Sequence, residues 1–140
     1  MTEYNDASIA HMTMIQGVIS RLETNALTLK ALAMTLATAV LAFFGSVENP
    51  DWVYPLAGCL PVLVFWYLDA KYLWLGRLFR RLYNGVRLKE VTEPFTMNIE
   101  PYQDQEQSVL RIAFSWSVGW VYSLIIITFM VVMGYHFSCG

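Results

Sequence analysis

A single carboxylate ends one of the apolar blocks of this sequence. Asp69 follows the apolar stretch 52–68 and precedes a series of basic residues. A carboxylate at the edge of a bilayer costs several kcal/mol unless a cation or water satisfies it. We therefore predict that Asp69 pairs with Arg21 or Lys30 of an antiparallel neighbouring helix, or with Arg77 through an intermediary. Such a pair either positions the helices or acts as a gate, and positioning is the commoner role.

Small and hydroxylated residues form two stripes at helical spacing. In the first apolar region the following six residues recur in steps of three and four, which places them on one helix face: Thr24, Thr28, Ala31, Thr35, Thr38 and Ala42. Further along the chain, Ser115, Gly119 and Ser123 recur every four residues. Such stripes permit close helix packing, the commoner use, or line a polar pathway in a ring of subunits. Three helices have too many small faces for one internal contact, so we expect a homo-oligomer.

Basic residues gather after the second apolar block, opposite a continuing apolar face. They are Arg77, Arg80, Arg81, Arg87 and Lys89. A basic surface of this kind binds anionic lipid, the acidic loop of a neighbouring subunit, or a nucleotide signal. Lipid is the commonest ligand. Because no base-stacking aromatic residues clearly share the polar face, no specific nucleic acid is expected as a partner.

Catalysis has little support in the residue pattern. The two histidines, His11 and His136, are expected on opposite sides of the membrane, and no Cys/His spacing suits a metal. The sequence contains no glycine-rich phosphate loop, no nucleophile elbow and no ionisable residue near the centre of a span. We predict that the protein is not an enzyme and binds no cofactor or metal.

Composition and block structure define the fold class. Of 140 residues, 56% are hydrophobic and only 14% are charged, which is too apolar for a soluble domain of this size. Apolar blocks cover 27–44, 52–68 and 112–133, and the last contains no charged residue. Each is long enough to cross roughly 25–30 Å of hydrocarbon at about 1.5 Å per residue. The sequence predicts an all-α membrane protein with three transmembrane helices.

Two of these helices extend beyond the bilayer. Apolar residues at three- and four-residue steps precede the first block and follow the second, which predicts long helices over 7–44 and 52–88. Their outer connection is short, so they form a hairpin whose cytoplasmic halves pack together. Residues 90–107 carry two prolines and five carboxylates and predict an acidic cytoplasmic loop, with a short extended piece over 95–99. The third span covers 110–134, and the chain 1–140 is one membrane domain.

Basic residues also set the orientation. With three spans, all nine Lys and Arg residues fall on one side of the membrane. Short loops rich in these residues stay in the cytoplasm. The N-terminus is therefore expected in the cytoplasm and the C-terminus in the periplasm or outside the cell.

Three segments together resemble a known group of proteins. They are MIQGVISRLETNALTLK (14–30), YPLAGCLPVLVFWYLDAKYLWLGRLFRRLYNGVR (54–87) and PFTMNIEPYQ (94–103). The chain resembles small bacterial membrane proteins of anti-phage defence islands, akin to accessory membrane proteins of RADAR-type systems and SLATT-type predicted pore formers. The marked positions of that family match residues 16–21 and 68–70 here. Residues 24–26, Thr-Asn-Ala, depart from the family's Asn followed by Ser.

The resemblance implies a membrane effector or accessory that disrupts or senses the bacterial inner membrane during infection. Combined with the stripes, it predicts an oligomeric, pore-forming or membrane-perturbing effector. In that hypothesis Asp69 and Arg21 hold the helices in register, and Thr28, Thr35 and Thr38 line or pack the central contact. The alternative is a non-conducting adaptor that recruits a cytoplasmic defence protein through its helical stalk and acidic loop.

Overall fold

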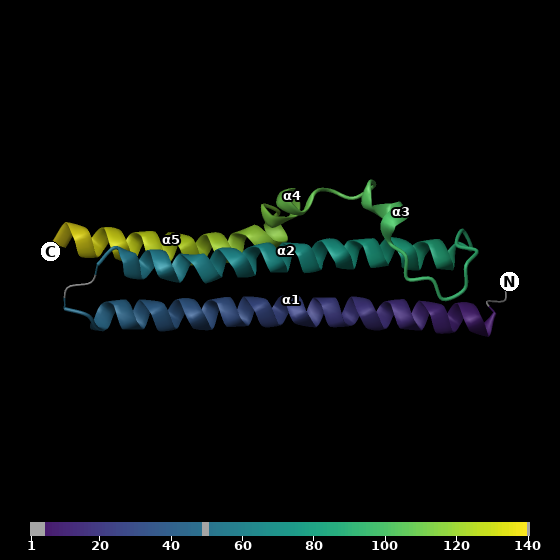
Figure 1. Cartoon of the computed structure of the whole chain (residues 1–140), viewed down its shortest axis with the longest axis horizontal. Coiled ribbons are helices and arrows are strands. Elements are labelled where there is room, and N and C mark those ends of the chain that lie inside the picture. The colour runs from purple at the N-terminus through teal and green to yellow at the C-terminus, as the bar shows by residue number, and fades with distance from the viewer. Residues whose placement is uncertain (1–4, 49–50, 140) are drawn as a thin grey trace.

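The computed structural model describes residues 5–48 and 51–139, and the regular elements within these ranges are all helices (Figure 1). The long helices are α1 (Asp6–Ser46), α2 (Val53–Arg87) and α5 (Trp116–Cys139), and the short ones are α3 (Glu100–Gln103) and α4 (Val109–Ala113). Helices α1, α2 and α5 are each long and apolar enough to cross a membrane. The predicted all-α membrane protein with three transmembrane helices is confirmed.

Helices α1 and α2 form the expected hairpin. They run antiparallel side by side over nearly their whole lengths, while α5 lies along only the first half of α2 (Figure 1). With 41 residues, α1 is about 60 Å long, roughly twice the thickness of the hydrocarbon core of a bilayer. We call the part of the hairpin beyond α5 the stalk; it comprises residues 6–26 of α1 and 71–87 of α2.

The stalk has its own small core. Ile15 of α1 and Leu82 of α2 are completely or almost completely buried there. Side chains from the segment after α2, including Met97 and Tyr102, pack over this cluster. Gly85 makes the approach possible, because a Cβ atom at that position would lie 2.7 Å from the Tyr102 hydroxyl oxygen. The loop after α2 therefore folds back onto the stalk.

The chain leaves α2 through a tight turn. The Glu90 N–H donates to the Gly85 carbonyl at 2.9 Å and the Lys89 N–H to the Val86 carbonyl at 3.1 Å. This bonding is that of a Schellman motif, whose left-handed residue is usually glycine. Here Lys89 adopts it with φ 60°. Within residues 90–107, which we expected to be a loop with an extended piece, the structure has the one-turn helix α3 and no strand.

The third span departs from the expected continuous helix over 110–134. Helix α4 ends at Ala113, and α5 begins at Trp116 after a break at 114–115. The Trp66 indole N–H donates to the Ala113 carbonyl at 2.8 Å, so α2 holds the chain at the break. A Cβ atom on Gly119 would lie 3.2 Å from the same carbonyl oxygen, so a side chain at this position would make a tight contact with the backbone at the break. Hydropathy alone could not locate this break because the whole block is apolar.

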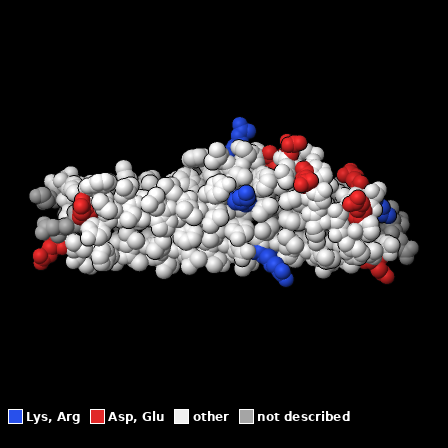
Figure 2. Space-filling view, in the orientation of Figure 1, with Lys and Arg blue, Asp and Glu red and all other residues white. Residues whose placement is uncertain are grey.

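The three spans meet along α2. A Cβ atom on Gly58 would lie 2.6 Å from Val40 of α1 and 3.1 Å from the Phe129 ring of α5, so this glycine sits where the helices are closest. Figure 2 shows a long band without charged side chains across this half of the molecule. Acidic side chains lie at its far end, and Lys and Arg side chains mark its border with the stalk (Figure 2).

Candidate functional site

An ion pair joins α1 to α2 where the three spans converge. Lys30 Nζ lies 2.6 Å from Asp69 Oδ2, and the Asp69 side chain is only 1% exposed. Tyr122 of α5 is fully buried beside it, with its hydroxyl within electrostatic reach of the carboxylate. Apart from the ion pair, the residues described provide no hydrogen bond to either carboxylate oxygen. Lys30 therefore provides the neutralising charge for the buried carboxylate, and the Tyr122 hydroxyl is the other polar group close to it.

Aromatic rings enclose the pair on the α5 side. The Trp66 and Tyr122 rings are stacked, with centroids 6.1 Å apart and an interplanar angle of 7°. Phe114, in the break before α5, meets Trp66 edge-on at 5.2 Å. A cluster of this kind excludes water, which strengthens the attraction between the charges but raises the cost of leaving either one alone. The junction is built as a fixed contact between the three helices.

The structure decides between the cations predicted for Asp69. Lys30 makes the pair, whereas Arg77 is bonded to Glu106 and Arg21 is exposed on α1. Of the three alternatives that the sequence left open, the structure contains the pair with Lys30, and geometry explains why it is not one of the arginines. Arg21 precedes Lys30 by nine residues, about 13 Å along the helix, and Arg77 follows Asp69 by eight, about 12 Å. Neither side chain reaches the level of the carboxylate.

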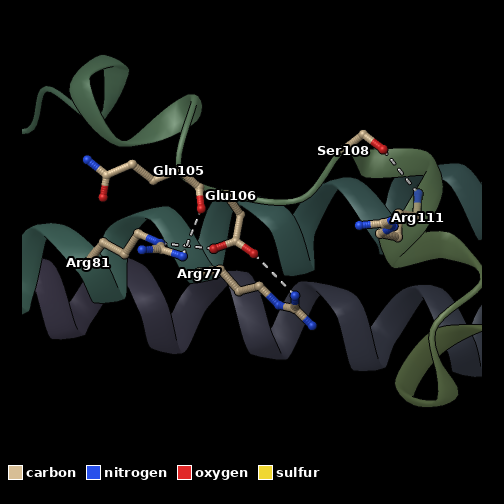
Figure 3. A network of polar contacts seen from close by, with 6 residues as sticks. All are labelled: Arg77, Arg81, Gln105, Glu106, Ser108 and Arg111. Atoms are coloured by element: carbon tan, nitrogen blue, oxygen red, sulfur yellow. Dashed lines mark hydrogen bonds and ion pairs between the residues drawn. The ribbon is translucent and has the colours of Figure 1, made fainter.

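A second polar site lies on the stalk, and we call it the arginine clamp: Arg77, Arg81 and Glu106 (Figure 3). Arg77 Nη1 donates to Glu106 Oε1 at 3.2 Å, and Arg81 Nε donates to Oε2 at 3.0 Å. Arg81 also donates through Nη2 to the Gln105 carbonyl at 3.0 Å. The two arginines are one helical turn apart on α2, so both guanidinium groups converge on one carboxylate.

The clamp changes the acidity of Glu106. Burial by itself raises the pKa of this carboxyl group, but hydrogen bonds from Arg81 and Arg77 outweigh it, so the pKa falls below its ordinary value of 4.5. Glu106 is therefore ionised at neutral pH. Its side chain is 7% exposed, whereas those of Arg77 and Arg81 are 32% and 41% exposed. The anion is covered and the cations remain partly accessible.

The other basic residues predicted to contact a partner or lipid lie around the clamp. Arg80 forms an ion pair with Glu23 of α1. Arg87 and Lys89 are exposed at the end of α2. Arg80 and Arg81 are thus both engaged by carboxylates of the chain itself, and a partner that used them would have to replace these contacts.

The threonine stripe of α1 lies on the exposed side of the helix, and its Thr38 borders a pocket that α1 forms with α5. Thr28, Thr35 and Thr38 are exposed, and their hydroxyl groups donate to the carbonyl four residues earlier at 3.0, 2.9 and 2.9 Å. Thr28 precedes the buried Ala37 by nine residues, and Thr35 precedes the buried Phe44 by nine. Nine residues are about two and a half helical turns, which places the stripe opposite the packed face.

The second predicted stripe, which consists of Ser115, Gly119 and Ser123, is less exposed than the threonine stripe of α1. Gly119 is buried and Ser115 and Ser123 are half-buried. Ser115 and Gly119 lie at the break before α5, where the Gly119 N–H donates to the Ser115 carbonyl at 2.8 Å. The close approach at Gly119 is to the backbone of its own chain at the break before α5.

Sequence reasoning missed three residues that join distant segments: Trp66, Glu106 and His11. Buried His11 of α1 bonds through Nε2 to the Thr96 carbonyl at 2.7 Å, and its ring lies 5.9 Å from that of Phe95. Phe95 has a φ of 58°, an unfavourable backbone conformation for a bulky residue. No spacing in the sequence links His11 to a residue 85 positions away.

Neither a metal site nor a similarity to known proteins assigns a function to the candidate sites. In the part of the chain that the structure describes, no three His, Cys, Asp or Glu side chains gather in a way that could hold a metal ion. Comparisons with protein-family models, curated proteins and solved structures find no match. The candidate sites therefore depend on geometry alone.

Proposed function

We propose that this protein self-associates in the membrane through the threonine stripe of α1 and acts as a pore-forming or membrane-perturbing protein. The observation that supports the proposal is the orientation of the stripe. Its small, hydroxylated side chains face outward on a membrane-length helix, opposite the face that packs on α2. Helix association in lipid favours small residues at the contact, because they let backbones approach closely.

Among the residues that the structure describes, the spans of a single copy pack together without a conducting path. Ala33, Val62 and Tyr122 are fully buried and form a continuous cluster where α1, α2 and α5 meet. Any polar pathway must therefore lie between copies. Around a ring of roughly four or more copies, the outward stripes of α1 would face a common axis, and the threonine hydroxyls would provide its polar lining.

The orientation and setting are also part of the proposal. The basic residues at the border of the uncharged band favour a cytoplasmic stalk, with the N-terminus inside and the C-terminus outside. The sequence resemblance is the basis for proposing a location in the bacterial inner membrane and a role in anti-phage defence. In that setting the stalk and its acidic loop are the parts available to a cytoplasmic defence protein.

The test combines subunit counting with ion flux. Native mass spectrometry of the protein in nanodiscs is expected to give a closed ring, and reconstituted liposomes are expected to depolarise. Thr35→Leu places a bulky side chain in the stripe and is expected to abolish depolarisation while the protein still inserts. Thr35→Ser is the matched control, because it keeps the hydroxyl group that donates to the Ala31 carbonyl and adds no bulk to the stripe. A monomer, or unchanged flux in Thr35→Leu, would contradict the proposal.

A further inference from the structure

The arginine clamp has the geometry of an anion-binding site that is occupied by a group of the same chain. Arg77 and Arg81 each bond one oxygen of the Glu106 carboxylate, at 3.2 and 3.0 Å. Paired guanidinium groups of this kind bind phosphate oxygens as readily as carboxylate oxygens, because both ligands present two acceptors at similar spacing. The geometry of the clamp therefore suits a phosphate group as well as a carboxylate group.

The position of the clamp along α2 places it near the expected edge of the bilayer. Tyr122 lies beside Asp69, and α5 begins six residues before Tyr122, which is about 9 Å further toward the stalk. Arg77 lies about 12 Å beyond Asp69 on α2 in the same direction. Arg77 is thus placed a few Å outside the apolar span. Lipid head groups fill a layer of about 5–7 Å there, and a long arginine side chain also reaches it from the next turn.

Because the Arg77 and Arg81 side chains are partly exposed, another anion can replace Glu106 without separation of the stalk helices. The Glu106 carboxylate is nearly covered, but the Arg77 and Arg81 side chains are each about one-third or more exposed, at 32% and 41%. A phosphate can bind their outer N–H groups before the glutamate has left. Arg81 has a further tie to the Gln105 carbonyl, so displacement of Glu106 loosens two adjacent positions of the loop.

We propose that the Arg77–Arg81 pair is a binding site for the head-group phosphate of an anionic phospholipid, and that this phosphate displaces Glu106. Glu106 lies two residues before Ser108, which caps α4 by accepting a hydrogen bond from the Arg111 N–H at 3.4 Å (Figure 3). Release of Glu106 frees residues 104–107 from α2, while the bond from Trp66 to Ala113 still holds the break before α5. The inference concerns the clamp and is independent of whether the protein conducts ions.

The test is hydrogen exchange of the full chain in nanodiscs of phosphatidylcholine alone or mixed with phosphatidylglycerol. Phosphatidylglycerol is expected to accelerate exchange over 103–107 by roughly fivefold to tenfold, the range for loss of exposed ion pairs. Glu106→Gln is expected to exchange fast in both lipids and to retain more phosphatidylglycerol in native mass spectrometry than the unaltered protein. Arg77→Gln/Arg81→Gln is expected to lose that retention.

Two controls identify the ligand and the site. Arg80→Gln removes one positive charge from the same part of α2 but breaks only the pair with Glu23, so lipid retention and the exchange response are expected to persist. Inorganic phosphate added to phosphatidylcholine nanodiscs is expected to leave the loop unchanged. Equal acceleration by free phosphate would overturn the lipid assignment. Equal lipid retention by the unaltered protein and the double arginine variant would overturn the site itself.

Discussion

Two sites in this molecule hold a buried carboxylate with basic side chains, but they are built in different ways. Asp69 has one cation, Lys30, and lies among helices and aromatic rings with its side chain 1% exposed. Glu106 has two cations, and both remain open to the outside. In a water-excluded environment an ion pair is costly to break, whereas an exposed pair is screened and exchangeable. The first site is suited to fixing the spans, and the second to releasing a loop.

The largest effect is expected from removal of one charge at the three-helix junction. Lys30→Met leaves the Asp69 carboxylate buried without its cation, and we expect it to lower the free energy of unfolding by about 3–5 kcal/mol. The measurement is thermal or denaturant unfolding in detergent. Lys30→Met/Asp69→Leu removes both charges and is expected to recover most of the loss, since an apolar pair is often as stable as a buried ion pair. A double variant no more stable than the single one would contradict this account.

A smaller effect is expected from the glycines that bring segments together in the two regions. Gly58→Ala places a Cβ atom 2.6 Å from Val40, between packed spans, and is expected to destabilise the protein by about 1–3 kcal/mol. Gly85→Ala meets the Tyr102 hydroxyl at 2.7 Å and a Val91 methyl group at 3.1 Å, both on loop side chains, and is expected to cost less than Gly58→Ala.

Gly76→Ala serves as the control for this comparison. A Cβ atom there has nothing described within 4 Å, so replacement is expected to stabilise α2 by up to about 1 kcal/mol through helix propensity. The three variants are compared by unfolding under the same conditions. If Gly85→Ala were as destabilising as Gly58→Ala, the loop would be packed as rigidly as the spans, and the contrast between the regions would fail.

The smallest effect is expected from the clamp, and it depends on pH. Because the folded protein lowers the pKa of Glu106, the clamp stabilises the protein above the ordinary value of 4.5, and this contribution is lost as the pH falls through the lowered pKa. We expect the unaltered protein to exceed Glu106→Gln in stability by about 1 kcal/mol at pH 7. The difference should be constant down to about pH 5 and disappear at lower pH. Unfolding of both proteins across this range measures it, and a difference that rises on acidification would contradict the assignment.

The hairpin and the spans could be predicted from periodicity because each helix carries its own apolar stripe. The expected bounds 7–44 and 52–88 lie within two residues of α1 and α2. The break before α5 could not be predicted, since it depends on the bond from Trp66 to Ala113, which joins residues 47 positions apart. Both residues look like ordinary members of apolar blocks in the sequence.

The partners of the charged residues also could not be chosen from the sequence. The sequence predicted that Asp69 needs a cation, because that follows from burial alone, but Lys30 could be chosen only once the register of α1 against α2 was known. The acidic loop offered five carboxylates to the basic face, and no feature of Glu106 distinguished it from the others. Selecting a partner requires the path of the loop, which depends on the stalk core and on the tight turn after Arg87.

The position of Lys30 and Asp69 within one hairpin has a consequence for biosynthesis. Both residues, and the helices that carry them, are present once residue 87 has been translated, before any of α5 exists. A lysine inside an apolar segment lowers the tendency of that segment to enter the membrane on its own. Entry as a pair with α2 brings the lysine into the bilayer already neutralised by its carboxylate. The order of the helices along the chain therefore allows the charge pair to form before α5 has been synthesised.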